Sequence, residues 1–439
     1  MFKILNYLQQ IRESPTVRRK LLFMVAILAL YRLMVFVPVP FVDVDTFMMA
    51  TMDDAGGLEF FAMLLGGTIE QFSIVAVGLI PFINASIIMQ LLAAVVPQLE
   101  ELKEQGETGQ MKIQQYTRYL TLPLAFVQAI GMIFFINNIL GGDVIQTTVG
   151  NVILAAFAMS VGTMILMWFG EMITEKGMAN GISLLIFSSI VAGMTSQVYN
   201  YIGQAGADIV GIIVFMFLLV LILVILAILL VKTKKDIPIV YSRQGNVEDT
   251  ASLPIPLNPV GMIPIIFAIA FASFPYLLSQ LMVRVGTQNE FVQASASWIE
   301  THLNIYTQQP SVIAIIVYFL LIVAFTFFYT IIVFNPDRMA DNIQKRGGFI
   351  PGIRPGEETA KYINQTLYHL CFWGGIGLGL IGIYSYVLSY IPFIQQATQS
   401  VGAIPVVVSG AGIIIIVNVV VDIINRLNSQ LAMEKYDKI

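Results

Sequence analysis

Long apolar runs constrain this chain most strongly, because they recur ten times and polar or charged segments separate them. A hydrocarbon core about 30 Å thick is spanned by roughly 20 apolar residues in a helix, whereas barrel strands would be about ten residues long and alternating. The sequence therefore predicts an all-α integral membrane protein with ten transmembrane helices. The runs lie at residues 20–39, 72–96, 119–140, 152–170, 182–202, 210–231, 258–283, 312–334, 366–391 and 404–424.

Composition excludes the main soluble classes. Only 11% of the 439 residues are Asp, Glu, Lys or Arg, and the mean hydropathy is +0.81. Soluble domains carry about a quarter charged residues, so neither a soluble enzyme nor a basic nucleic-acid-binding module fits. The single cysteine, Cys371, excludes an intramolecular disulfide and a cysteine-based metal cluster. The two histidines, His302 and His369, argue against a histidine-rich zinc or haem site.

The basic residues predict an orientation. With ten spans, 21 of the 23 Lys and Arg residues fall on one side of the membrane, which the positive-inside rule makes the cytoplasm. Both termini, residues 1–19 and 428–439, are then cytoplasmic. The first of these segments is amphipathic, so we expect it either to lie on the membrane surface or to pack as an ordinary helix on other protein.

A four-residue motif indicates an internal repeat. Residues 78–81 read Gly-Leu-Ile-Pro and residues 261–264 read Gly-Met-Ile-Pro, each in the second span of a five-span half. Because five is odd, the halves, residues 20–202 and 203–427, run in opposite directions through the membrane, with function expected between them. Proline inside a span frees a carbonyl and bends the helix, so we expect two bent helices that suit a gate.

Charged residues are almost missing from the middle of the spans. Ion-coupled transporters usually carry them there, and an intramembrane enzyme would need a nucleophile–base pair. No such pair and no Gly-rich phosphate loop is visible, so we expect neither an enzyme nor a cofactor or metal site. An inverted-repeat secondary transporter of a small solute is the alternative. Asp422 and Arg426 are four residues apart, and we expect them to pair along one helix.

Two uncharged features leave alternatives open. Asn84 and Gln90 in the second span either make ordinary interhelical hydrogen bonds or line a seam that opens and closes. The segment 58–65 in the predicted outer loop is apolar but too short to span. It is either a surface or re-entrant helix or a movable element over a pore.

Several motifs occur in a fixed order along nearly the whole chain. The most specific is residues 348–356, Gly-Phe-Ile-Pro-Gly-Ile-Arg-Pro-Gly. The other segments are 36–40, 78–92, 115–119, 175–183, 258–268, 334–336 and 340–342. Together these motifs resemble the bacterial SecY family, the central subunit of the protein-conducting channel.

The resemblance implies a pore between the two halves that conducts unfolded polypeptides across the bacterial plasma membrane and releases apolar segments sideways into lipid. It implies SecE-like and SecG-like membrane subunits, and either the SecA ATPase or a translating ribosome as the driving partner. Preproteins with signal peptides would be the substrates. The cytoplasmic loops at about 232–257 and 335–365 would dock the driving partner, although the positive-inside rule alone also explains basic residues there.

The resemblance also implies roles for individual residues. The pore ring would be Leu79, Ile83, Ile182, Ile186, Ile266 and Ile415. The plug, within about 55–70, would contain Leu58, Phe60, Phe61, Met63, Leu64, Leu65, Gly66 and Gly67. The lateral gate would include Asn84, Gln90 and Phe274. The docking residues would be Lys232, Lys234, Lys235, Arg243, Arg346 and Arg354.

Overall fold

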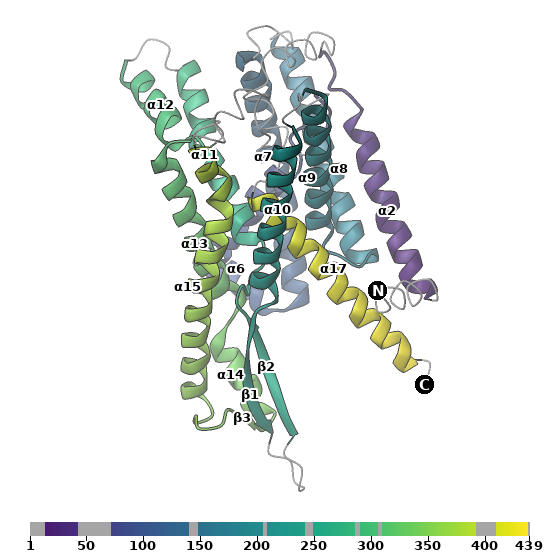
Figure 1. The fold of residues 1–439 in the computed structure, drawn as a ribbon, viewed down its shortest axis with the longest axis vertical. Coiled ribbons are helices and arrows are strands. Elements are labelled where there is room, and N and C mark those ends of the chain that lie inside the picture. Colours follow the sequence, from purple (N-terminus) through teal and green to yellow (C-terminus); the bar gives the residue numbers. More distant parts are fainter. Residues whose placement is uncertain are drawn as a thin grey trace.

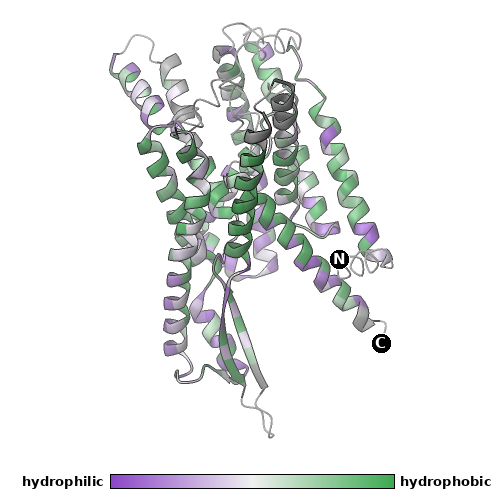
Figure 2. Ribbon diagram, in the orientation of Figure 1, coloured by the Kyte–Doolittle hydropathy of each residue, from purple (hydrophilic) through white to green (hydrophobic). Residues whose placement is uncertain are grey.

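The structure is a computed structural model that describes residues 14–42, 72–139, 148–204, 209–241, 249–285, 290–305, 310–391 and 410–437. It is a bundle of long helices with a small sheet at one end (Figure 1). Apolar residues dominate the middle of the bundle, and hydrophilic residues are more frequent toward the end that bears the sheet (Figure 2).

Each predicted apolar run contains part of a described helix. These helices are α2 (Pro15–Val35), α5 (Ile80–Val95), α7 (Glu107–Ile139), α8 (Val149–Lys176), α9 (Gly181–Gln204), α10 (Ile209–Lys232), α11 (Ile263–Val285), α13 (Val312–Val333), α15 (Glu357–Leu388) and α17 (Gly410–Asp437). By length and apolarity, five spans are found among the described residues, or six if α5 and the bent α6 (Pro97–Glu104) form one. The fold class is confirmed, and ten crossings stay a prediction.

The Gly-x-Ile-Pro motifs have the same local structure in both halves. Gly78 and Gly261 have φ angles of 62° and 70°, in the left-handed region that glycine adopts readily. A helix begins two residues after each, so Pro81 and Pro264 are the second residues of α5 and α11. The expectation that these prolines bend a helix from inside was wrong. Proline lacks the N–H that a first helical turn leaves unpaired, so it starts a helix well.

Helix packing repeats between the two halves. In the first half α5 packs on α7, α7 on α8, α8 on α9, and α2 on α8. In the second half α11 packs on α13, α13 on α15, α15 on α17, and α10 on α15. Corresponding helices therefore keep corresponding neighbours, which supports the internal repeat that the short motif indicates.

The two segments expected to be docking loops contain regular structure. Strands β1 (Lys234–Tyr241), β2 (Asp249–Pro256) and β3 (Gly348–Phe349) form an antiparallel sheet in the order β2-β1-β3. Helix α14 (Pro336–Lys345) and the start of α15 pack on this sheet. Their shared core consists of Ile237, Ile239, Ile255, Ile343, Ile350, Ile363 and Leu367. A Cβ on Gly348 would lie 2.8 Å from the Tyr241 ring, so glycine permits this packing.

The two ends of the described chain meet. The Ser14 hydroxyl accepts from the Val17 N–H as the N-cap of α2 and donates to Oε1 of Glu434 in α17 at 2.8 Å. The N-terminal end of α2 and the C-terminal end of α17 both point toward the end of the molecule that bears the sheet (Figure 1). This arrangement agrees with an even number of crossings, whereas the assignment of that side to the cytoplasm stays a prediction. Helix α12 (Glu290–Leu303) lies at the opposite end and packs on α11 and α13.

Candidate functional site

Five of the six predicted ring residues belong to the main core, which both halves share. Leu79 and Ile415 are buried, and Ile182, Ile186 and Ile266 are partly buried against the same cluster. They come from the turn before α5 and from α9, α11 and α17. All five side chains are aliphatic, and none is titratable or able to ligate an ion.

Two of the six ring residues have other close neighbours. Ile83 packs on a separate cluster formed by Ile87, Phe267 and Ala270, which joins α5 to α11. Ile182 lies against α8, since a Cβ on Gly170 would be 2.9 Å from its Cγ1. Ile83 therefore contributes to the contact between helices of opposite halves.

Aromatic side chains of α13 pack against this contact. The Phe267 ring lies edge-on to Phe325 and Tyr329, with centroid distances of 6.0 and 5.6 Å, and Phe271 also meets Phe325 at 5.9 Å. The seam between α5 and α11, named here the α5–α11 seam, is thus a small apolar contact next to an aromatic group. Apolar contacts of this kind carry no directional bonds of their own, so they can separate and reform.

The predicted polar gate residues lie on the same two helices. The Gln90 side-chain nitrogen donates to the Ser86 hydroxyl at 3.0 Å, whereas its Oε1 is buried and unpaired among the described residues. Asn84 is partly buried in α5, and Phe274 lies in α11 directly before Pro275. The hydrogen bond of Gln90 stays within α5, so the structure brings these three residues to the seam helices without a described polar bond across them.

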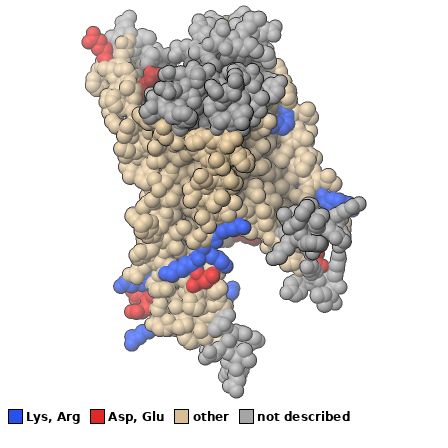
Figure 3. All heavy atoms as spheres, in the orientation of Figure 1, with Lys and Arg blue, Asp and Glu red and all other residues tan. Residues whose placement is uncertain are grey.

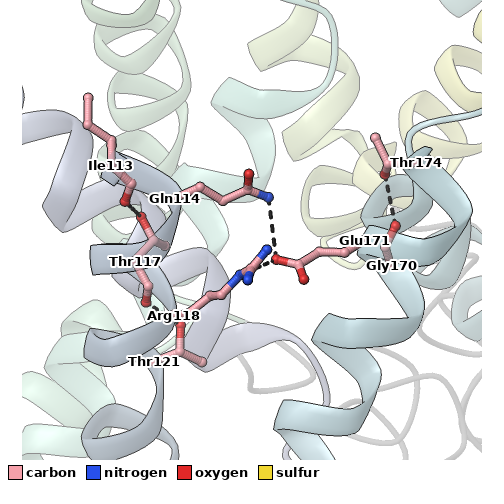
Figure 4. A network of polar contacts seen from close by, with 8 residues as sticks. All are labelled: Ile113, Gln114, Thr117, Arg118, Thr121, Gly170, Glu171 and Thr174. Atoms are coloured by element: carbon pink, nitrogen blue, oxygen red, sulfur yellow. Dashed lines mark hydrogen bonds and ion pairs between the residues drawn. The ribbon is translucent and has the colours of Figure 1, made fainter. Parts of the chain in front are cut away.

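A charged pair that sequence reasoning did not find links α7 to α8. Nε of Arg118 lies 2.6 Å from Oε1 of Glu171, which also accepts from Gln114 at 3.3 Å (Figure 4). Close by, the Thr174 hydroxyl donates to the Gly170 carbonyl and accepts from the Gly181 N–H. The network fixes neighbouring helices of the first half. The sequence signal for this ion pair was the presence of opposite charges at the ends of two neighbouring predicted spans.

Arg32, the charged residue within the first predicted span, serves helix packing. Its Nη2 donates to the Ser188 carbonyl of α9 at 2.9 Å, and the neighbouring Tyr31 hydroxyl shares a hydrogen bond with Ser189.

Among the described residues, no group of three or more metal-ligating side chains is found.

Basic residues gather at the end that bears the sheet (Figure 3). Lys232 ends α10, Lys234 and Lys235 begin β1, and Arg346 follows α14. Lys234 pairs weakly with Asp236 at 3.5 Å. Arg243 and the whole predicted plug, with Leu58, Phe60, Phe61, Met63, Leu64, Leu65, Gly66 and Gly67, lie outside the described residues.

Arg354 is presented by a well-defined turn. It is exposed between Gly352 and Gly356, whose φ angles of 80° and 99° suit glycine. The Thr359 hydroxyl donates to the Arg354 carbonyl at 2.9 Å and so ties the turn to the start of α15. The backbone is thereby held while the Arg354 side chain is exposed.

Solved structures define the class of protein to which this fold belongs. A structure described as that of a protein-conducting channel covers 95% of this chain and 92% of its own, with a TM-score of 0.60 and 18% identity. Canine Sec61 in a ribosome–channel complex gives a TM-score of 0.56 and 16% identity with the same coverage. The chain thus has the fold of a protein-conducting channel.

Sequence relatives identify the family. The model of the SecY family matches residues 73–424. The protein translocase subunit SecY of Staphylococcus epidermidis is 34% identical over 440 residues, which cover 96% of each chain. That of Staphylococcus aureus is 34% identical over 97% of this chain and 96% of its own. The chain belongs to the SecY family, whose members are multi-pass membrane proteins.

Proposed function

We propose that this chain is the pore-forming subunit of a protein translocation channel. It conducts unfolded secretory polypeptides across the bacterial plasma membrane and releases transmembrane segments sideways into lipid. The observation that carries the proposal is the 34% identity to protein translocase subunits over nearly the full length of both chains, together with the channel fold. No observation specifically favours the alternative function, a secondary transporter of a small solute.

The seal of the resting channel is proposed to be an aliphatic ring. Leu79, Ile186, Ile266 and Ile415 share one cluster, to which Ile182 also contributes, and Ile83 lies next to it at the seam. A narrow aliphatic constriction removes water from an ion and supplies no ligands in return, which costs several kcal/mol or more. It makes no directional bonds to a peptide, so chains of any sequence can slide through. The segment 58–65 is proposed to rest on the ring as a plug, with Gly66 and Gly67 as its hinge.

Lateral release is proposed to occur through the α5–α11 seam. The seam consists mainly of Ile83, Ile87, Phe267 and Ala270, so an apolar segment can replace these contacts by equivalent ones. Asn84, Gln90 and Phe274 are proposed to line the same route.

The end that bears the sheet is proposed to be the cytoplasmic docking surface. Lys232, Lys234, Lys235, Arg243, Arg346 and Arg354 would contact a SecA-type ATPase or a ribosome, and the structurally related Sec61 is described in a ribosome–channel complex. The planar guanidinium of Arg354 can pair with a carboxylate or phosphate through two parallel hydrogen bonds, which lysine cannot do. SecE-like and SecG-like subunits are proposed to complete the channel in the membrane.

The proposal is tested by reconstitution. The complex purified from native membranes is placed in lipid vesicles with a SecA-type ATPase, ATP and a preprotein, and protease-protected preprotein is measured. Protection that requires this chain and ATP supports the function. Uptake of a small solute without any protection of preprotein would replace it by the transporter alternative.

A further inference from the structure

Helix α6 connects the helix at the seam to the opposite half of the molecule. The chain leaves α5 at Val96, which has an extended backbone, and turns by 103° into α6. α6 packs on α7, within the first half, while α5 packs on α11 of the second half. A contact from α6 to the second half therefore bridges the two halves at the sheet-bearing end of the seam.

Lys103 makes such a contact. Its Nζ donates to the carbonyl oxygen of Ile332 at 2.9 Å, across 229 positions of the sequence. Ile332 lies in the last turn of α13, where a carbonyl normally lacks a helical partner. Its N–H donor in a continued helix would be residue 336, which is proline and has none. The end of a helix also carries partial negative charge, so this carbonyl favours a cation.

The surroundings of Lys103 suit a contact that can be released. Glu100 lies three residues earlier on α6, a spacing that places both side chains on the same helix face. Burial lowers the pKa of Lys103, Arg338 at the start of α14 lowers it further, and Glu100 acts in the opposite direction. An ammonium that leaves Ile332 together with α6 therefore moves away from Arg338, and the carboxylate of Glu100 can be a new partner on its own helix.

We propose that Lys103 is a positioning residue that holds the α5–α11 seam closed in the resting channel by binding the open carbonyl of Ile332. When the halves separate, the ammonium exchanges this carbonyl for Glu100. The inference rests on the proposed function, because it assigns a resting and an open state to the channel. The physical content is a single solvent-exposed, charge-assisted hydrogen bond between halves, so its loss should shift the closed-to-open ratio by about two- to fivefold.

The test measures the distance between the halves without any export substrate. Spin labels are attached to cysteines introduced at the exposed positions Gln98 in α6 and Asn342 in α14. The native Cys371 is buried, so the label should not reach it. Pulsed electron paramagnetic resonance then gives their distance distribution in the purified complex in vesicles. Lys103→Met should broaden the distribution toward longer distances. Lys103→Arg, which keeps a cationic donor, should resemble the parent protein.

Lys112→Met is the matched control, because it removes an exposed lysine of α7 in the same half. A parent-like distribution in Lys103→Met, or an equal broadening in Lys112→Met, would overturn the inference. Export activity is measured separately on the same preparations. If the parent protein does not export preprotein at all, the proposed function is contradicted. The distance measurement still decides whether Lys103 holds the halves together.

Discussion

Gly162 shows how a single residue sets the distance between a helix and the segment before α5. A Cβ at this position of α8 would lie 2.1 Å from the backbone carbonyl oxygen of Ile74. We expect Gly162→Ala to lower the free energy of unfolding by about 1–3 kcal/mol, because backbone must move to admit the methyl group. Thermal unfolding in detergent measures the change.

Gly131 in α7 provides the matched control. A Cβ there would have no neighbour within 4 Å. Gly131→Ala should therefore raise the free energy of unfolding by about 0.5–1 kcal/mol, because alanine favours the helix. A shift of the same sign and size in both variants would show that the close approach to Ile74 does not matter.

Arg354 supports a second prediction for a single residue, on docking. Arg354→Glu should abolish ATP-driven preprotein export while the protein remains folded in the membrane, because charge reversal repels the carboxylate or phosphate of the partner. Arg354→Lys should retain part of the activity. Lys112→Glu, which reverses an exposed charge on α7 outside the proposed docking segments, is the control and should export nearly normally. Normal export by Arg354→Glu would reject the role.

Secondary-structure elements were predictable where one local rule decides them. Every apolar run contains a helix, and Asp422 pairs with Arg426 at 3.1 Å along α17, as the four-residue spacing predicts. The start of α5 at Ile80 was not anticipated, because a proline in an apolar run was expected to bend a helix and not to begin one. The Gly-Leu-Ile-Pro order was the available signal.

Contacts between distant elements were beyond local rules. The sheet joins β1 to β3 across about a hundred residues, and β3 has only two. Ile237 and Ile239 alternate with an exposed proline, which is a strand signal, but their partners Ile343 and Ile363 lie on later helices. The Lys103–Ile332 bond likewise depends on how the two halves pack, which no spacing in the sequence encodes.

The α5–α11 seam gives a prediction for a pair of helices. Cysteines at Ile87 and Phe267, which pack in one cluster, should form a disulfide under mild oxidation and lock the two helices. Insertion of transmembrane segments should then stop and should return with reductant. Gel mobility after cleavage between the halves reports the disulfide. Each single-cysteine variant is the control. A locked pair that still inserts transmembrane segments would exclude this seam as the exit.

The whole molecule consists of two similarly packed halves that share one apolar core. Main-core residues from α9 and α17 pack together, and α5 meets α11 through a smaller cluster. The seam cluster between α5 and α11 is therefore separate from the main core that α9 and α17 share, and smaller than it. Separation should begin at the small contact, since less apolar area is exposed there.

This asymmetry separates the roles of the predicted ring residues. Replacing Ile186, Ile266 and Ile415 together by serine should make the resting channel leak small ions, because hydroxyl groups and water then replace a dehydrating constriction. Translocation should largely continue, since the ring makes no specific bonds to the substrate. Single-channel recordings in planar bilayers measure the leak.

Ile83→Ser, alone, should act differently because Ile83 packs in the seam cluster and not in the main core. We expect brief openings without a steady leak, since a weakened seam can reclose over an intact ring.

Deletion of residues 58–65 should loosen the closed state in the same direction as the triple replacement if the segment is a plug. Recordings in which the triple variant and the deletion are both as tight as the parent protein would refute the ring and the plug together. A steady leak from Ile83→Ser equal to that of the triple variant would instead place Ile83 in the ring.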